Sequence, residues 1–508
     1  MVTHDIARQL TEISHDINRQ VGLLVSRRGE VVYVIVGSYR GILIPSLDAF
    51  PAASTRFRGL RLIHTHLSGE DLSTDDLMDL ALLKLDLVCA IATDENGLPA
   101  LAYTAHLVPE NPDGQYWLKL PPQRPSEMDL DFLAFIQALE GEFAGKQKTR
   151  KVGALDRAIL VRTETNSRVD GEASLDELRE LARTCGVAVF DAVVQHRLQI
   201  DPKYVLGKGK LPELAIKALQ MDANLLIFDH ELSPAQVRSI SDVMEMRVVD
   251  RTQVILDIFA RRAHSREGKL QVELAQLKYL LPRLVGKNPA LSRITGGIGA
   301  RGPGETKLEM DRRRIRERIH RLEKEIQAVA QARDQRRAKR GKAGLPIISI
   351  VGYTNAGKST LLNVLTKGTA FTEDLLFATL DPKSSRLRFP KDREAIITDT
   401  VGFIRDLPPD LFTAFRATLD ELKEADILLH LIDISGPHFE MQMEAVEKIL
   451  QDLNMDKKPL LRVFNKIDRF PDSDLLVTLC QRYNAVAISA LQPATLPGLL
   501  EKLESYIQ

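Results

Sequence analysis

Cysteine is scarce in this sequence, and its three residues lie far apart. Cys89, Cys185 and Cys480 form no C-x-x-C pair, which excludes a disulfide framework and a cysteine-based zinc finger. Long apolar runs are also absent, because no window reaches the roughly 18 uninterrupted apolar residues of a membrane span. The first residues show no apolar segment behind a basic start, as a secretory leader would. We therefore expect a cytoplasmic protein without a membrane span, which leaves open a peripheral association with a membrane surface.

The sequence also lacks net charge, with 69 Lys and Arg residues against 69 Asp and Glu residues. Binding to a nucleic acid would therefore depend on a local basic patch. Residues 301–342 contain such a patch, with 15 Lys and Arg against 7 Asp and Glu. A solvated helix face explains part of this excess, and contact with a phosphate backbone is the alternative. Both interpretations stay open.

The 508 residues predict roughly three to five domains, each large enough to bury a core. Short apolar runs with one helical stretch are typical of a small α/β or α+β domain, and regular alternation of strands and helices favours a parallel sheet. We expect an α/β multidomain protein of five segments: a small domain at 1–118, a linker with an amphipathic helix at 119–155, an α/β domain at 156–250, a helical hairpin at 251–342 and a nucleotide-binding domain at 343–508.

Apolar side chains in the predicted hairpin repeat at alternating steps of four and three residues. This spacing is typical of two helices that pack as an antiparallel coiled pair. The connection at 286–306 is glycine-rich and longer than a minimal turn, which indicates either a function or mobility. The repeat consists of Leu270, Leu274, Leu277, Leu281 and Leu284 before the connection, and Leu308, Arg312, Ile315, Ile319, Leu322, Ile326 and Val329 after it.

The stretch "PIISIVGYTNAGKSTLLNVL" combines an apolar strand, the motif G-x-x-x-x-G-K-S and an amphipathic helix. In this context backbone amides surround phosphates, Lys358 neutralises the β and γ oxygens and the charge of the transition state, and Ser359 supplies a hydroxyl to Mg²⁺. The predicted phosphate-binding residues are Gly352, Tyr353, Thr354, Asn355, Ala356, Gly357, Lys358, Ser359 and Thr360.

Two further stretches have the order and spacing of switch elements. Thr379 lies in a loop-like stretch, where it can close over the γ-phosphate and complete the magnesium shell. Asp399 ends an apolar strand and can hold Mg²⁺ through water, while the Gly402 amide faces the γ-phosphate. The predicted switch residues are Phe377, Ala378, Thr379, Leu380 and Asp381, followed by Asp399, Thr400, Val401 and Gly402.

A third sequence element predicts which nucleotide base the protein binds. Asp468 follows the strand of "LLRVFNKID", and a carboxylate there can accept two hydrogen bonds from guanine that adenine does not offer. A backbone amide near Ser489 can meet the guanine O6. The predicted base-binding residues are Asn465, Lys466, Ile467, Asp468, Ser489, Ala490 and Leu491. Together these motifs predict an enzyme that binds GTP and hydrolyses it to GDP and phosphate.

Phe403 occupies the position where many GTPases carry a glutamine that orients the attacking water. A benzyl group can neither donate nor accept a hydrogen bond, so no catalytic side chain for water is assigned in this chain. Packing of Phe403 beneath the loop is compatible with this interpretation. We expect slow hydrolysis until a partner completes the site, an effect that reaches roughly 10³ to 10⁵ in rate.

Four long motifs resemble the HflX family of ribosome-associated GTPases: "LGKGKLPEL", "GGIGARGPGETKLEMDRRRIRERI", "FATLDP" and "DTVGFIRDLPPDLFTAFRATLDE". The resemblance covers about residue 158 to the end. It implies an N-terminal α/β domain, a helical hairpin and a G domain. It also implies binding to the large (50S) ribosomal subunit and its RNA, and separation of stalled or idle ribosomes. We expect a monomer, with Lys208 and Lys210 in a basic loop that touches RNA.

Residues 1 to about 145 fall outside this resemblance. "LIHTHLSGEDLSTDDLMDLA" is similar to the His-x-His…Ser-x-x-Asp signature of JAB/MPN and RadC-like domains, although Leu67 replaces its proline and the following gap is one residue shorter. The resemblance implies zinc binding by His64, His66 and Asp76, with Glu30 as our choice for the glutamate that activates water. Alternatively, His-x-His shares one face of a strand for structural reasons alone.

Two alternatives to the ribosome-associated GTPase therefore remain. One is an RNA- or protein-binding scaffold that GTP switches. The other is a metallohydrolase regulated by its G domain.

Overall fold

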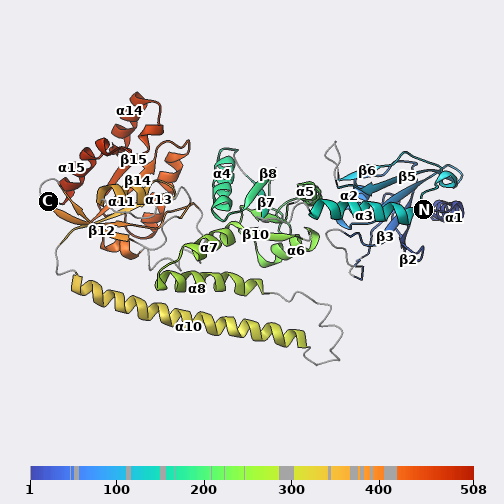
Figure 1. The fold of residues 1–508 in the computed structure, drawn as a ribbon, viewed down its shortest axis with the longest axis horizontal. Helices are drawn as coiled ribbons and strands as arrows, with labels where there is room; N and C mark the ends of the chain where they lie inside the picture. The colour runs from blue at the N-terminus through green and yellow to red at the C-terminus, as the bar shows by residue number, and fades with distance from the viewer. Residues whose placement is uncertain are drawn as a thin grey trace. The chain divides into compact units, whose positions relative to one another are not determined.

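The computed structural model (Figure 1) describes residues 2–45, 47, 49–50, 56–109, 116–148, 156–165, 168–207, 209–221, 223–244, 246–284, 303–340, 345–366, 376–377, 383–389, 393–405 and 420–507. The chain forms two compact units. The first unit contains Met1–Thr165, Phe190–Leu226 and Gln236–Val248, and the second contains Asn166–Val189, Ile227–Ala235 and Val249–Gln508. The division into five segments stays a prediction.

The N-terminal part contains a six-stranded sheet with the order β2-β1-β3-β4-β5-β6. Strands β3 and β4 pair in parallel, and the other neighbours pair antiparallel. The strand β4 is buried along its whole length because its residues are apolar or small. The elements are α1 (His4–Ile17), β1 (Val21–Ser26), β2 (Val31–Val36), β3 (Leu60–His66), α2 (Thr74–Leu82), β4 (Leu87–Thr93), β5 (Pro99–Leu107) and β6 (Trp117–Lys119).

The amphipathic helix of the predicted linker is part of this first core. It forms α3 (Phe132–Lys148), which follows the short turn η1 (Pro125–Glu127). Phe132, Ile136 and Leu139 are buried in the same apolar cluster as the strands β1, β3 and β4. The helix α3 is therefore part of the hydrophobic core of the N-terminal part.

A four-stranded sheet with the order β10-β9-β7-β8 follows. The predicted alternation of strands and helices is confirmed, since a helix or a helix-containing connection separates each strand from the next. Apolar runs such as "LLIF" in β9 are fully buried. The elements are β7 (Arg157–Glu164), α4 (Arg168–Thr184), β8 (Ala188–His196), α5 (Lys210–Gln220), β9 (Leu225–Phe228), α6 (Pro234–Met244) and β10 (Arg247–Asp250).

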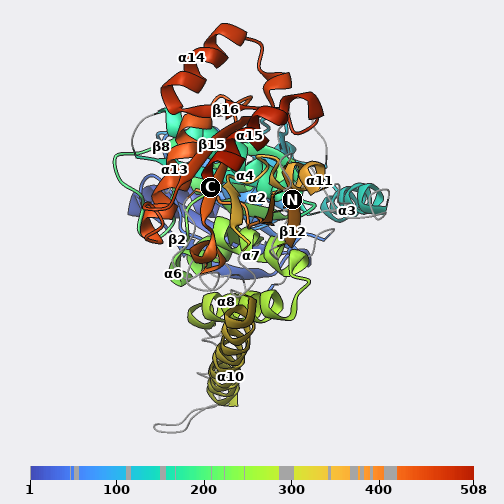
Figure 2. The same cartoon turned by 90° about the vertical axis from the view of Figure 1, so that its left-hand side faces the viewer.

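The predicted helix pair is confirmed. After α7 (Arg251–Arg262), α8 (Arg266–Arg283) and α10 (Pro303–Arg340) lie side by side (Figure 1, Figure 2). Leu270, Leu274 and Leu322 form their buried seam. Arg318 donates to both carboxylate oxygens of Glu273 at 2.8 Å, and Arg312 donates to the Leu284 carbonyl, so the helices run antiparallel. Most of the glycine-rich connection lies outside the described residues.

The C-terminal part is a six-stranded sheet with the order β12-β13-β11-β14-β15-β16, in which only β12 runs antiparallel to its neighbour. The carboxyl ends of the parallel strands meet at one edge, where such sheets bind ligands. The elements are β11 (Ile347–Gly352), α11 (Lys358–Thr366), β12 (Lys383–Arg388), β13 (Glu394–Asp399), η3 (Asp420–Glu424), β14 (Ile427–Asp433), α13 (Phe439–Asp452), β15 (Leu460–Asn465), η4 (Ile467–Arg469), α14 (Ser473–Tyr483), β16 (Ala485–Ala487), η5 (Pro493–Thr495) and α15 (Pro497–Tyr506).

Among the described helices, none combines the length and the apolar character that crossing a membrane would require.

Candidate functional site

The loop between β11 and α11 is held against the end of β15. The Asn465 amide nitrogen donates to the Ala356 carbonyl at 2.8 Å. Gly357 has a φ of +93°, and a Cβ at this position would lie 2.4 Å from the same amide nitrogen. Only glycine fits this close approach without displacing Asn465. The second glycine of the motif therefore allows the loop and the base-recognition segment to touch.

Lys358 is buried beneath the loop. Its Nζ donates to the Gly352 carbonyl at 3.1 Å and to the Tyr353 carbonyl at 2.7 Å. Burial lowers the pKa of Lys358 to about 8, and the nearby Asp399 opposes that shift. A Cβ at Gly402 would lie 3.0 Å from this Nζ and 2.9 Å from Thr354 Cγ2. The chain at Gly402 thus lies directly against the lysine and the loop.

Ser359, near the start of α11, and Asp399, at the carboxyl end of β13, are neighbours. The Ser359 hydroxyl donates to Asp399 Oδ2 at 2.6 Å, and Asp399 is fully buried. A hydroxyl and a carboxylate are hard oxygen ligands of the kind that Mg²⁺ prefers. The remaining predicted switch residues Ala378, Thr379, Leu380 and Asp381 lie outside the described residues, whereas Phe377 is described and buried.

Four of the predicted base-recognition residues make side-chain hydrogen bonds across the site, from Asn465 to Ala490 and from Ser489 to Asp468. Asn465 Oδ1 accepts from the Ala490 amide at 2.9 Å, which joins the two segments. Ser489 Oγ donates to Asp468 Oδ1 at 2.5 Å, while the rest of Asp468 is exposed. Lys466 has a φ of +63° and pairs with Asp433 Oδ2 at 2.7 Å. The Asp468 carboxylate is therefore held at the edge of the site with one oxygen restrained.

Phe403 packs into the protein and joins the loop through its backbone. Its amide donates to the Gly352 carbonyl at 3.0 Å, and its carbonyl accepts from the Thr354 amide at 2.8 Å. The residue is 3% exposed. The packed position that we considered compatible with the sequence is the one observed.

Tyr353 shows a contact that the sequence did not predict. Its hydroxyl donates to Glu177 Oε1 of α4, and it accepts a hydrogen bond from the Arg405 amide at 2.9 Å. Glu177 also pairs with Arg251 at the start of α7. The spacing of α4 and α7 predicts amphipathic helices and gives no sign of these partners.

In the N-terminal part, His64, His66 and Asp76 come together and are buried. His64 Nε2 lies 3.0 Å from His66 Nε2 and 3.1 Å from Asp76 Oδ1, and His66 Nε2 lies 3.4 Å from Asp76 Oδ2. Burial raises the pKa of Asp76, but hydrogen bonds from both histidines and Ser73 outweigh it and hold the pKa well below its usual range. Asp76 also accepts from the Ser73 amide and so caps α2.

The prediction for Glu30 is wrong. Its carbonyl accepts from the Ser26 amide in the turn between β1 and β2, and Ser26 pairs with Leu60 at the start of β3. His64 and His66 lie at the other end of β3, and the four residues from Leu60 to His64 span about 13 Å of extended strand. The antiparallel register therefore separates Glu30 from the cluster.

Of the two lysines that we expected in an RNA-binding loop, the structure describes only Lys210, which is the first residue of α5. Lys208 lies outside the described residues. Lys210 pairs with Glu213 one turn along α5, at 2.5 Å. This local ion pair accounts for its side chain, and its contact with RNA stays a prediction.

Three family models match consecutive parts of the chain. A model described as GTP-binding GTPase N-terminal matches residues 172–260, GTP-binding GTPase Middle Region matches 262–340, and 50S ribosome-binding GTPase matches 347–466. Together they follow the observed order of the α/β elements, the helix pair and the six-stranded nucleotide domain.

Individual relatives extend over the same region. The GTPase HflX of Caldanaerobacter subterraneus subsp. tengcongensis is 48% identical over 349 residues, covering 69% of this chain and 80% of that protein. The GTPase HflX of Escherichia coli K12 is 44% identical over 350 residues, covering 68% and 82%. A solved GTP-binding protein from Sulfolobus solfataricus, in complex with GDP, is 25% identical over 70% of this chain and 99% of that chain, with a TM-score of 0.39.

These matches confirm the predicted multidomain α/β fold with a P-loop GTPase domain and HflX-type N-terminal and middle regions. The protein is a GTPase, which binds GTP and hydrolyses it to GDP and phosphate. Mg²⁺ is the usual cofactor of P-loop GTPases, and Ser359 and Asp399 fit it chemically. The chain belongs to the HflX family of GTPases.

Proposed function

We propose that this GTPase acts as a monomer on the large ribosomal subunit, and that its GTP-bound form separates stalled or idle ribosomes. The match of residues 347–466 to 50S ribosome-binding GTPases supports the partner. The observation that carries the proposal is a set of exposed basic side chains on α10.

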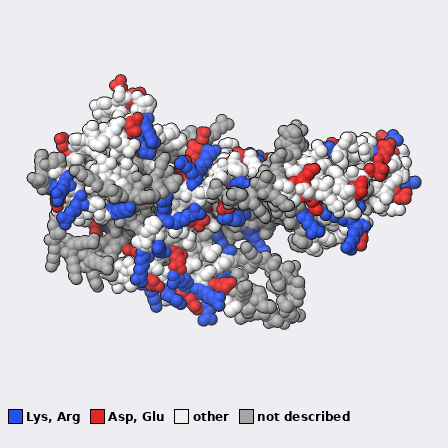
Figure 3. Space-filling model, in the orientation of Figure 1, with Lys and Arg blue, Asp and Glu red and all other residues white. Residues whose placement is uncertain are grey.

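Acidic neighbours account for only part of the charge on α10. Arg313 pairs with Glu317, and Arg318 pairs with Glu273, so basic and acidic side chains alternate along the described part of the helix pair (Figure 3). Four exposed cations of α10 have no ion pair with any described residue: Arg314, Arg316, Arg321 and Lys324. Arg314, Arg321 and Lys324 lie on the same side of the helix and extend over about 15 Å, which suits contact with successive phosphates of RNA.

We assign the nucleotide contacts to the residues predicted from the motifs. The amides of 355–358 and Lys358 bind the phosphates, and Gly402 meets the γ-phosphate. Ser359 and Thr379 hold Mg²⁺ directly, and Asp399 holds it through water. Asp468 recognises guanine. The hydrogen bonds of Ser359 with Asp399 and of Ser489 with Asp468 support these assignments.

Phe403 supports a role for the partner in catalysis. Its ring is buried and has no group that can orient water. We propose that the bound large subunit completes the site by ordering the switch segments or by donating a group. GTP then persists until the protein is on the ribosome, and hydrolysis releases it.

Reversing the charge of Arg314 and Arg321 tests the α10 contact. The double variant Arg314→Glu/Arg321→Glu is expected to bind isolated large subunits roughly tenfold to a hundredfold more weakly, with a smaller salt dependence. Binding is measured by pelleting with a non-hydrolysable GTP analogue at several salt concentrations.

The matched control is Arg19→Glu/Arg28→Glu, which makes the same change in net charge at exposed positions of the N-terminal part. It should bind like the wild type. Equal affinity of the α10 variant and the wild type would contradict the proposed RNA contact.

We propose zinc binding by His64, His66 and Asp76 as a second candidate function. His66 Nδ1 lies 3.1 Å from the Glu70 carbonyl, and donation to that carbonyl leaves Nε2 of the neutral ring without a proton, as a metal ligand requires. Two histidines and a carboxylate form a common zinc ligand set with an open fourth position. Because Glu30 lies elsewhere, the observation supports metal binding and gives no support to the predicted hydrolase activity.

Metal analysis of the purified full chain, prepared without chelator, tests this site. We expect about one zinc per chain in the wild type and almost none in His64→Gln/His66→Gln, since two of three ligands are lost. His15→Gln, an exposed residue of α1, is the control and should keep its zinc. Zinc-free wild type, or an unchanged zinc content in the double variant, would rule out the site.

A further inference from the structure

A cavity of about 320 Å³ lies within the first compact unit, lined by residues of α2, α5 and α6 and of the segments that follow them. Helices α2 and α5 are in contact. Ile216 of α5 belongs to the same buried apolar cluster as the strands β1, β3 and β4. The cavity is therefore part of a packed region of the protein.

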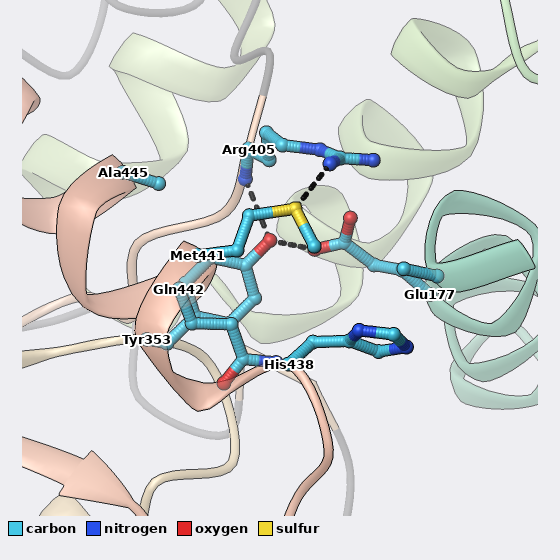
Figure 4. Close-up of a pocket in the computed structure, with 8 residues that line it drawn as sticks. Glu177, Tyr353, Arg405, His438, Met441, Gln442 and Ala445 are labelled. Carbon is cyan, nitrogen blue, oxygen red and sulfur yellow. Dashed lines mark hydrogen bonds between the residues drawn. The ribbon is translucent and has the colours of Figure 1, made fainter. Parts of the chain in front are cut away.

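The volume of this cavity sets the size of an occupant. Voids in protein interiors are seldom larger than a water molecule, whereas 320 Å³ corresponds to roughly ten waters at about 30 Å³ each. By comparison, the hollow beside Glu177, Tyr353 and Arg405 in Figure 4 has about 40 Å³, room for roughly one water. The larger cavity reaches the lower end of the range of small-molecule sites, roughly 300 Å³, and suits a molecule of about ten non-hydrogen atoms.

Small and flexible apolar side chains form much of the lining. Ala81 of α2 and Ala215 and Ala218 of α5 are buried, and so is Met244 of α6. Met246 also lines the cavity, and the unbranched thioether chain of methionine adapts to the shape of an apolar ligand. Among the described residues of the lining, none is aromatic, so the cavity has no ring on which a nucleobase could stack. These features suit an aliphatic group.

The two charged side chains of the lining are both cationic. Lys84 follows α2 with a φ of +48°, and its ammonium group makes no ion pair with any described residue. Arg247 is already paired, since its Nη1 donates to Asp156 Oδ2 at 3.1 Å. No described residue of the lining is acidic. Lys84 therefore supplies one positive charge, which a ligand with one negative charge would balance.

Asn224 adds a hydrogen-bond donor to the lining. Its backbone amide donates to the Arg157 carbonyl at 3.0 Å, and its Oδ1 accepts from the Arg157 amide at 2.8 Å. These two contacts hold the residue and leave the Nδ2 group for a ligand. A carboxylate accepts hydrogen bonds from both an amide and an ammonium group. A phosphate monoester carries a charge of about −1.5 to −2, which a single free cation matches less well.

We propose that this cavity binds an aliphatic monocarboxylate of about ten non-hydrogen atoms. The aliphatic chain lies against the alanine and methionine side chains, and the carboxylate binds Lys84 and the Asn224 amide group. For a compact ligand of this size we expect a Kd of about 0.1–1 mM. Binding requires neither GTP nor the ribosome.

Calorimetric titration of the full chain with octanoate tests this site, because octanoate is a carboxylate of the required size. We expect saturable binding, and weaker binding of neutral octanol. Ala223→Leu places a larger side chain in the cavity from the loop between α5 and β9, and should weaken octanoate binding roughly tenfold or more. Lys84→Met should weaken octanoate binding roughly tenfold and leave octanol binding unchanged, since only the contact with the charge is lost.

Arg28→Met is the matched control, because it removes an exposed cation from the turn between β1 and β2. It should bind octanoate like the wild type. Thermal unfolding of each variant without ligand separates loss of the site from loss of folding. Octanoate that does not bind saturably, or that binds folded Ala223→Leu and Lys84→Met as tightly as the wild type, would overturn the proposal. Tighter binding of octanol or octyl phosphate than of octanoate would overturn it as well.

Discussion

Isolated large ribosomal subunits are expected to accelerate GTP hydrolysis by this protein roughly 10³-fold or more. The reason is the site around Phe403, which is buried, bonded to the loop through its backbone and unable to orient water. On the assignments that we propose, Lys358, Ser359 and Asp399 provide charge and magnesium ligands, so the missing contribution concerns the nucleophile. Phosphate release in single turnovers, with and without subunits, measures the acceleration.

Small subunits serve as the control and should have little effect. The Arg314→Glu/Arg321→Glu variant should need a higher concentration of large subunits to reach the same maximal rate, since only binding is impaired. Fast hydrolysis by the protein alone would show that the site is complete without a partner. Binding to the large subunit without acceleration would instead favour the scaffold that GTP switches.

Replacing Asp468 by Asn is expected to lower the affinity for GTP by roughly 10² to 10⁴ and to raise the affinity for xanthosine triphosphate. The Asp468 carboxylate can accept two hydrogen bonds from the N–H groups of guanine. The Asn amide has only one oxygen, so its NH₂ group would face an N–H group of guanine and both donors would stay unpaired. Xanthine carries an oxygen where guanine carries the amino group, so it suits the amide. Competition against a fluorescent nucleotide measures both affinities.

Asp472→Asn is the control for this substitution. Asp472 caps α14 by accepting from the Leu475 amide, and Asn caps helices about equally well. It should therefore bind GTP like the wild type. If Asp468→Asn keeps its preference for GTP over xanthosine triphosphate, Asp468 does not read the base.

The core of the nucleotide site could be predicted from sequence because its geometry follows from local motifs. The loop, Lys358 and Ser359 are contiguous, and Asp399 and Asn465 each end a strand of the same sheet. Once the strands are parallel, their carboxyl ends meet, and residues at those ends become neighbours. The contacts of Ser359 with Asp399 and of Asn465 with Ala490 follow from that rule.

The α4–α7 contacts could not be predicted in this way. Tyr353 and Glu177 are 176 residues apart, and Arg251 and Arg405 are 154 apart. Periodicity identifies the buried face of a helix, but it does not tell which distant loop covers that face. The prediction that Glu30 lies beside the two histidines failed for a related reason. The register of β1 on β3 decides which end of the sheet Glu30 occupies, and sequence periodicity does not give that register.

Sucrose-gradient sedimentation of intact ribosomes with this protein and a non-hydrolysable GTP analogue tests the proposed function most directly. The account predicts that the peak of intact ribosomes gives way to separate subunits, with the protein on the large subunit, and that GDP in place of the analogue leaves the ribosomes intact. Ribosomes that stay intact with the analogue, while the protein remains at the top of the gradient, would contradict it.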